Sequence, residues 1–136
     1  MAKKTKFESG NYKLKVKRSS AGLGLFAGET IPKGACIIEY KGRVISEEEE
    51  YTSRSKYLFE VNSKKTIDGQ ARTNTARYIN HSCRPNADPE IRKGQIFIMA
   101  LRQIKPGEEI CYDYGKEYFD THIRSMGCRC AKCQKV

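Results

Sequence analysis

Alternating apolar and polar positions run through most of the chain and predict short β-strands. Residues 12–17 alternate apolar and basic side chains, as expected of a strand with one buried face. A hairpin is predicted for residues 89–104, because Lys93-Gly94 suits a turn with positive φ. Further strands are predicted at 35–40, 57–61 and 108–115.

Only two stretches favour a helix. Residues 46–55 begin with Ser46, a good N-cap, followed by the acidic first turn Glu47 to Glu50. Residues 71–79 predict a second, short helix, whereas Ile67-Asp68-Gly69 is typical of a turn. Few helices and no βαβ alternation favour a β-rich α+β fold and argue against a parallel nucleotide-binding sheet.

The length of 136 residues predicts a single domain, and 38% apolar residues is enough for a modest core. The first six residues are charged and lead into no apolar segment, so they do not resemble a signal peptide. No apolar run approaches the length of a membrane span. We therefore expect an intracellular protein with no membrane partner.

The net charge of +10 predicts attraction to acidic partners, with nucleic acid as one candidate. The lysines are scattered, however, so a solvated basic surface explains the charge equally well. Glu47 to Glu50 form a local acidic patch that would attract a lysine-rich substrate. Charge alone leaves these alternatives open.

Reactive and polar residues are concentrated in residues 77–86, Arg-Tyr-Ile-Asn-His-Ser-Cys-Arg-Pro-Asn. One interpretation is structural: a helix ends before Pro85, and Asn80 and Ser82 satisfy backbone groups. The other interpretation is chemical, because a plain surface loop rarely contains both a His and a Cys directly after apolar residues. A second tyrosine-bearing stretch, residues 108–115, favours the chemical interpretation.

Three stretches, taken in order, resemble the SET-domain protein lysine methyltransferases. They are the NHSCxPN sequence at 80–86, EExxYDYG at 108–115 and the less specific GxGLFA at 22–27. The resemblance covers roughly residues 12–136 and is greatest to the compact single-domain SET proteins of bacteria and viruses. It implies short strands in several small sheets with a pseudoknot. It also implies a basic tail at 1–10, a SET domain at 11–115 and a post-SET segment at 116–136.

The resemblance implies methyl transfer from S-adenosylmethionine (SAM) to a lysine side chain. Tyr114 matches the catalytic tyrosine, Tyr112 borders the lysine channel, and Tyr57 resembles a channel aromatic. For Tyr57 the alternative is simple core packing with its hydroxyl at the surface. The implied cofactor contacts are Ala21, Gly22, Leu23, Gly24, Tyr51, Asn80, His81, Tyr114 and Phe119, with Tyr118 as an alternative to Phe119.

Three cysteines within residues 128–133 suit a tetrahedral zinc site that lacks one ligand. By composition alone, the fourth ligand is any of Cys36, Cys83, Cys111, His81 and His122. The resemblance implies the set Cys83, Cys128, Cys130 and Cys133. The tail spacing here is C-x-C-x2-C, whereas the family's usual spacing is C-x-C-x4-C.

The function implied is SAM-dependent protein-lysine N-methylation, mainly monomethylation, with a structural zinc. A histone or another basic DNA-associated protein is the candidate substrate. One alternative is a catalytically inactive SET-fold module that binds nucleic acid or chromatin proteins through its positive charge. Another is a zinc-stabilised interaction protein.

Overall fold

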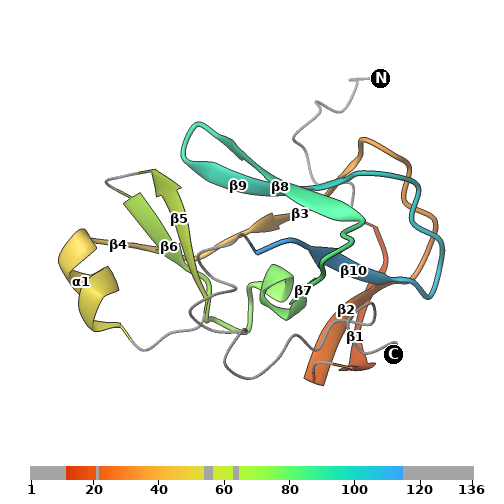
Figure 1. Cartoon of the computed structure of the whole chain (residues 1–136), viewed down its shortest axis with the longest axis horizontal. Helices are drawn as coiled ribbons and strands as arrows, with labels where there is room; N and C mark the ends of the chain where they lie inside the picture. The colour runs from red at the N-terminus through yellow and green to blue at the C-terminus, as the bar shows by residue number, and fades with distance from the viewer. Residues whose placement is uncertain (1–11, 21, 54–56, 63–64, 115–136) are drawn as a thin grey trace.

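The computed structural model describes residues 12–20, 22–53, 57–62 and 65–114, and within these ranges it consists mainly of short strands (Figure 1). The strands are β1 (Leu14–Ser19), β2 (Gly22–Ala27), β3 (Cys36–Tyr40), β4 (Arg43–Ile45), β5 (Leu58–Asn62), β6 (Lys65–Asp68), β7 (Asn80–His81), β8 (Ala87–Arg92), β9 (Gln95–Ala100) and β10 (Glu109–Tyr112). The helical elements are α1 (Glu47–Thr52) and the 3-10 turn η1 (Thr75–Tyr78).

The described strands form three small sheets. Their orders are β1-β2-β10-β7, β3-β9-β8 and β4-β6-β5. In the first sheet β10 is antiparallel to β2 but parallel to β7. In Figure 1, α1 lies beside the β4-β6-β5 sheet at one end of the molecule, and β1 and β2 lie towards the other. The expected β-rich fold with several small sheets and few helices is confirmed.

The strand β10 joins segments that are far apart in the sequence. Its residue Glu109 pairs with Phe26, and Cys111 pairs with Asn80. Beyond β7, the side chain of Asn86 continues the pairing: its Nδ2 donates to the Glu109 carbonyl at 2.8 Å, and its Oδ1 accepts from the Cys111 N–H at 2.9 Å. The last strand is thereby seated between the first and middle parts of the chain, in line with the pseudoknot that the resemblance implies.

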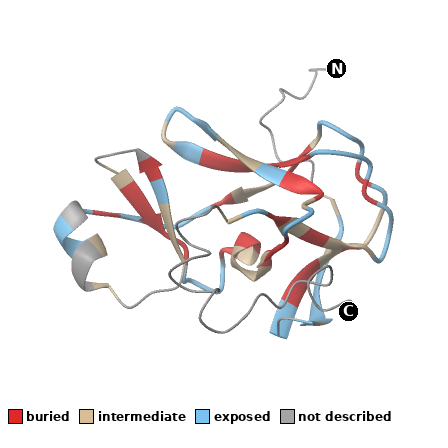
Figure 2. Cartoon of the chain, in the orientation of Figure 1, coloured by how far each residue is buried: buried red, intermediate tan, exposed pale blue. Residues whose placement is uncertain are grey.

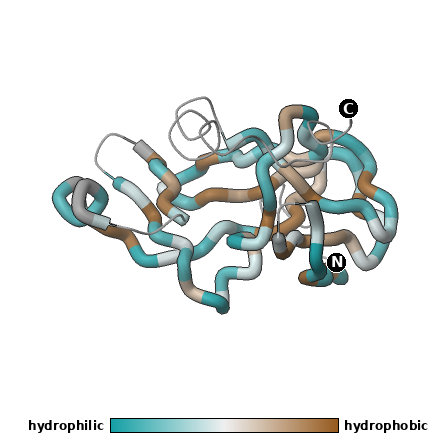
Figure 3. The backbone as a smooth tube through the Cα atoms, turned by 60° about the horizontal axis from the view of Figure 1, so that its bottom comes forward, coloured by the Kyte–Doolittle hydropathy of each residue, from teal (hydrophilic) through white to brown (hydrophobic). Residues whose placement is uncertain are grey.

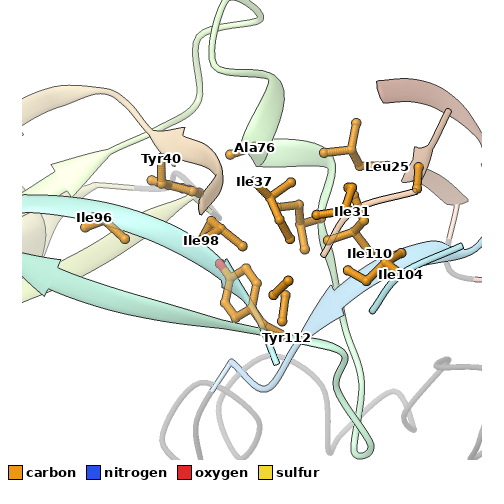
Figure 4. Packing of buried hydrophobic residues seen from close by; sticks show 14 of the residues in the cluster. Leu25, Ile31, Ile37, Tyr40, Ala76, Ile96, Ile98, Ile104, Ile110 and Tyr112 are labelled. Carbon is orange, nitrogen blue, oxygen red and sulfur yellow. The ribbon is translucent and has the colours of Figure 1, made fainter. Parts of the chain in front are cut away.

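The main core cluster takes residues from all three sheets, among them Leu25 and Ile110 of the first, Ile37 of the second and Ile67 of the third (Figures 2 and 4). In β9, Ile96 and Ile98 face the main cluster, while Phe97 and Met99 join Cys36 in a second small one. Both faces of β9 are therefore covered. Figure 3 shows the hydrophilic character of α1, whose exposed position matches it. The largest fully buried side chains are Leu25, Ile31, Ile37, Ile79, Ile96, Ile98, Ile104 and Ile110.

The turn and the helix cap predicted from the sequence are confirmed. The β8–β9 turn has φ of 50° at Lys93 and 79° at Gly94, as its sequence predicts. Ser46 caps α1, since its Oγ accepts from the Glu49 N–H at 3.2 Å. In the described ranges, no helix has the length and apolar character needed to cross a membrane.

Two local predictions were wrong. Ile67 lies within β6 rather than in a turn, because its side chain joins the core between β4 and β5. The helix predicted at 71–79 is only the 3-10 turn η1, since the chain must become extended at Ile79 to enter β7. The glycine-bearing stretch forms strand β2, which pairs along its length with β1.

Replacing Asn86 with alanine should strongly destabilise the fold. The partly buried Cys111 N–H would lose its side-chain acceptor, and the Glu109 carbonyl would lose a donor. We expect the free energy of unfolding to fall by about 3 kcal/mol in urea titrations. Gln103→Ala, at an exposed position, is the control and should change it by less than about 0.5 kcal/mol. Equal values for the two variants would contradict the role of Asn86 in holding β10.

Candidate active site

Two tyrosines and a histidine meet where β10 ends beside β7. Tyr112 pairs with His81 across the parallel strands. The ring of Tyr114 lies 5.0 Å from that of Tyr112 and 5.4 Å from that of His81, measured between centroids. The structure thus brings together three residues that the sequence analysis assigned to one site.

Tyr114 is held by hydrogen bonds at its hydroxyl and at its backbone N–H. Its hydroxyl donates to the Ile79 carbonyl, and its backbone N–H donates to Nδ1 of His81 at 3.1 Å. The strand ends at Tyr112, so simple strand alternation does not place Tyr114. These two hydrogen bonds place it instead.

His81 is a neutral imidazole in this arrangement. An N–H can only donate, so the bond from Tyr114 makes Nδ1 an acceptor and leaves the ring proton on Nε2, which lies 3.6 Å from Cys83 Sγ. Burial lowers the pKa of His81, and the nearby Asp113 carboxylate, 3.7 Å from Nδ1, opposes that shift only in part. His81 is only 8% exposed, so the loss of water around its charged form is the larger effect.

Tyr112 belongs to the hydrophobic core as much as to the site. It is 6% exposed, and Figure 4 shows its ring extending from β10 into the buried cluster. The ring of Phe59, on β5, lies 6.4 Å from it. The Tyr112 ring is therefore held rigidly by its packing in the core.

Asn80 links three strands through one amide group. Its Nδ2 contacts the Ser19 hydroxyl at 3.1 Å, the Leu23 carbonyl at 2.9 Å and the Glu109 carboxylate at 2.9 Å. Two amide hydrogens serve three acceptors, so the side chain has little freedom to rotate. Asn80 fixes the relative position of β1, β2 and β10.

The two glycines of the GxG stretch differ in their surroundings. A Cβ at Gly24 would lie 2.4 Å from Oε2 of Glu109 and 3.1 Å from Nδ2 of Asn80. The space at Gly24 is therefore filled by the protein's own side chains. A Cβ at Gly22 would meet no atom within 4 Å, and its φ is +98°. Gly22 and the 54%-exposed Leu23 keep an open surface.

Tyr57 stands at the start of β5 with its backbone firmly held. Its carbonyl accepts from the Tyr40 hydroxyl at 2.8 Å and from the Gly69 N–H at 2.9 Å. The guanidinium of Arg77 lies over its ring, 4.4 Å from the centroid. The sequence analysis singled out neither Arg77 nor Glu109, although both stand within the stretches that suggested the site.

Of the predicted metal ligands, only Cys83 lies in the described residues, where it is exposed. In the part of the chain that the structure describes, no three His, Cys, Asp or Glu side chains form a metal-binding group. Cys36 is buried beside Phe97 and Met99, as expected of a small core residue. The predicted residues Ala21, Phe119, Tyr118, His122, Cys128, Cys130 and Cys133, and the side chain of Tyr51, lie outside the described residues.

The acidic run on α1 is partly engaged within the protein. Glu49 pairs with Arg43 at 2.9 Å, and Glu50 accepts from the Thr66 hydroxyl at 2.8 Å.

A second acidic group adjoins the tyrosines. The pKa of Asp88 is raised, mainly by burial and then by the neighbouring charges of Glu90 and Asp113. Asp113 stands between Tyr112 and Tyr114 in the sequence and is exposed. Asp113 therefore places a carboxylate beside the tyrosines, and Asp88 and Glu90 on β8 lie near enough for their charges to interact.

The strand topology and the site residues define a SET domain. The SET domain family matches residues 22–115, and the chain belongs to this family.

Among its relatives, the histone-lysine N-methyltransferase trr of Drosophila melanogaster is 37% identical over 146 residues, covering 98% of this chain but 6% of that protein. The probable histone-lysine N-methyltransferase set-23 of Caenorhabditis elegans is 36% identical and covers 84% of this chain and 54% of that protein. The chain thus spans a small part of the one relative and about half of the other.

Two solved structures of KRYPTONITE have a similar fold. The complex with mCHG DNA and SAH has a TM-score of 0.70 and 29% identity, covering 90% of this chain and 29% of that one. The complex with mCHH DNA, an H3(1–15) peptide and SAH has a TM-score of 0.67 and 30% identity, covering 78% and 24%.

Placing alanine at Gly24 should displace the Glu109 carboxylate from Asn80. We expect Gly24→Ala to lower the free energy of unfolding by about 1–2 kcal/mol, because a charge-assisted hydrogen bond is lost. In a Glu109→Ala background the clash disappears, so the same substitution should cost much less. Urea titration of the two single variants and the double variant measures this coupling. Additive losses would show that the crowding at Gly24 is not what matters.

Proposed function

We propose that this chain is a SAM-dependent protein-lysine N-methyltransferase. The observation that carries the proposal is the fixed position of Tyr114, held at its hydroxyl by Ile79 and at its backbone by His81, with Tyr112 beside it. The names of the relatives, which are histone-lysine N-methyltransferases, support the same activity. SAH, present in both KRYPTONITE structures, is SAM without its methyl group.

The chemistry explains why aromatic residues suit this site. A free lysine has a pKa of about 10.4, so it is almost fully protonated at neutral pH and has no lone pair to react. Bound SAM supplies an electrophilic methyl group on a positively charged sulfur. The walls formed by Tyr112, Tyr114 and Phe59 exclude water and favour the neutral amine. The Tyr114 hydroxyl would orient that amine.

The residues around Gly22 fit a ligand such as SAM. The open space at Gly22 and the exposed Leu23 leave the backbone of this edge accessible. Asn80 and His81 adjoin it in β7, with Asn80 bonded to the Leu23 carbonyl. In the proposal the remaining contacts with SAM come from Ala21, Gly24, Tyr51 and Phe119. Gly24 contributes by leaving room for Asn80.

We extend the proposal to the substrate class, a lysine within a basic protein segment. The carboxylates of Asp88, Glu90 and Asp113 would attract such a segment. The H3(1–15) peptide in one KRYPTONITE complex supports a histone or a similar DNA-associated protein. A substrate of this kind would place the enzyme inside the cell, in the nucleus or the nucleoid.

A methyl-transfer assay tests the proposed activity. Purified protein incubated with labelled SAM and mixed basic proteins should transfer label to protein. Tyr114→Phe should lower turnover by about a hundredfold or more while changing SAM affinity little, because the hydroxyl acts mainly in the transition state. DNA retention without any labelled protein would instead favour the inactive nucleic-acid-binding module. Near-normal turnover of the variant would show that another tyrosine is catalytic.

We also propose a structural zinc ion held by Cys83, Cys128, Cys130 and Cys133. Cys83 is exposed close to β7, where its thiol is accessible to a tail ligand set, and thiolates are the ligands that zinc prefers in structural sites. The ion would tie the C-terminal segment to the end of β7, beside His81 and Tyr114.

Removing zinc should therefore affect the C-terminal segment without unfolding the SET core. We expect Cys130→Ser, or chelation, to increase proteolysis beyond Gly115 and to lower activity, while hydrogen exchange in β9 and β10 stays protected. Metal analysis of the reduced protein should give one zinc per chain. A chain that contains no zinc and is fully active would rule out this site.

The extent of methylation is proposed to depend on Tyr112. A hydroxyl at this wall can hold a water beside the amine, which leaves little room for a nitrogen that already carries a methyl group. Losing such a hydrogen bond is worth only about 1 kcal/mol, yet about 1.4 kcal/mol changes a rate ratio tenfold.

We therefore expect mainly monomethyl-lysine from the native enzyme, and a shift to di- and trimethyl-lysine in Tyr112→Phe. Mass spectrometry over a time course measures the products, and Tyr78→Phe provides a tyrosine control away from β10. Efficient trimethylation by the native enzyme would be incompatible with a Tyr112 switch.

A further inference from the structure

We propose that Arg77 is a positioning residue that fixes the ring of Tyr57 relative to Tyr114 and so sets the geometry of the lysine channel. The inference rests on the proposed methyltransferase function, in which these two tyrosines border the substrate amine. Arg77 acts through Tyr57 and is not itself assigned a contact with substrate or cofactor.

The first support is the stacking of Arg77 on aromatic rings. Its guanidinium carbon lies 4.4 Å from the centroid of Tyr57 and 5.3 Å from that of Tyr78. Both distances are within the range of cation–π attraction, and the planar guanidinium also stacks on aromatic faces. The pKa of Arg77 is raised chiefly because its side chain hydrogen-bonds Tyr57. The Arg77 side chain thus stacks on the face of the Tyr57 ring.

The second support is the burial of Arg77 Nε. Arg77 Nε is buried and has no hydrogen-bond partner among the described residues. Leaving such a donor unsatisfied costs free energy, so an arginine that served only as a surface charge would turn it towards water. The ring contacts with Tyr57 and Tyr78 explain why Arg77 keeps this orientation.

The third support is that the same short segment also holds Tyr114. Arg77 lies in η1, and the carbonyl of Ile79, two residues later, accepts from the Tyr114 hydroxyl. Ile79 is only 1% exposed. At the other end of the turn, Asn74 donates to the Gly69 carbonyl and accepts from the Lys41 N–H, both at 3.0 Å. Tyr57 and Tyr114 are therefore both held in position by the same turn, η1.

The backbone contacts of Tyr57 explain why its ring needs a separate restraint. Tyr40 and Gly69 fix the Tyr57 carbonyl, but these bonds do not determine the rotation of the side chain. Arg77 contacts the ring itself. Arg77 therefore restrains the rotation of the Tyr57 ring, which the backbone hydrogen bonds leave undetermined.

Arg77→Lys tests this directly, because lysine keeps the positive charge but lacks the planar group. We expect about a tenfold rise in the KM for a lysine peptide, with SAM affinity unchanged within about twofold. In NMR spectra of tyrosine-labelled protein, the Tyr57 ring resonances should shift while those of Tyr112 and Tyr114 stay in place. Arg72→Lys, at an exposed arginine just before η1, should change none of these quantities.

A double-variant cycle with Tyr57→Phe separates positioning from general stabilisation. If Arg77 acts through Tyr57, the effects of the two substitutions on the peptide KM should be far from additive. Additive effects would overturn the inference, as would a SAM affinity that falls as much as the peptide KM rises, or Tyr57 resonances that do not move in Arg77→Lys.

The outcome for the proposed function is read separately. Absence of methyl transfer by the native protein would refute the function, and the Tyr57 resonances would still report whether Arg77 orients the ring. Methyl transfer by the native protein together with an unchanged KM in Arg77→Lys would refute only the role of Arg77.

Discussion

The seating of β10 between β2 and β7 is the constraint on which the rest of the structure depends. The strand β10 pairs antiparallel with β2 and parallel with β7. Beyond the end of β7, the side chain of Asn86 forms two further hydrogen bonds with β10. This position brings Tyr112 into the core and Tyr114 against His81. A shift of one residue in β10 would reverse the faces of its side chains and remove Tyr112 from both the core and the site.

Most polar groups of the site are already hydrogen-bonded to other groups of the protein. The Asn80 amide is shared among Ser19, Leu23 and Glu109, and the Tyr114 hydroxyl is bonded to a backbone carbonyl. Such preorganisation lowers the cost of arranging the reacting groups once substrate binds. It also makes each of these residues a matter of local stability, so activity and folding have to be measured together.

Local signals in the sequence predicted the local structure well. The Ser46 cap, the Lys93-Gly94 turn and most strands follow from interactions between near neighbours. The motifs also placed Asn80, His81, Tyr112 and Tyr114 in one site, although their contacts span more than thirty residues. What could not be predicted depends on long-range packing: Gly24 makes room for Glu109 and Asn80, and Arg77 meets Tyr57 only after β5 and η1 have come together. Ile67 was misplaced for the same reason, since its strand is defined by partners on both sides.

The parallel pairing of β7 with β10 has a consequence for how the protein is made. Contacts between distant segments form late and slowly, because a long loop must close before they contribute any stability. During synthesis, β1 to β9 leave the ribosome before β10 exists, and β2 and β7 lack the strand that joins them. The strands β2 and β7 and the residue Tyr114 therefore come together only in the last stage of folding. A nascent chain that has not yet reached β10 lacks the contacts that bring Tyr112 and Tyr114 against His81.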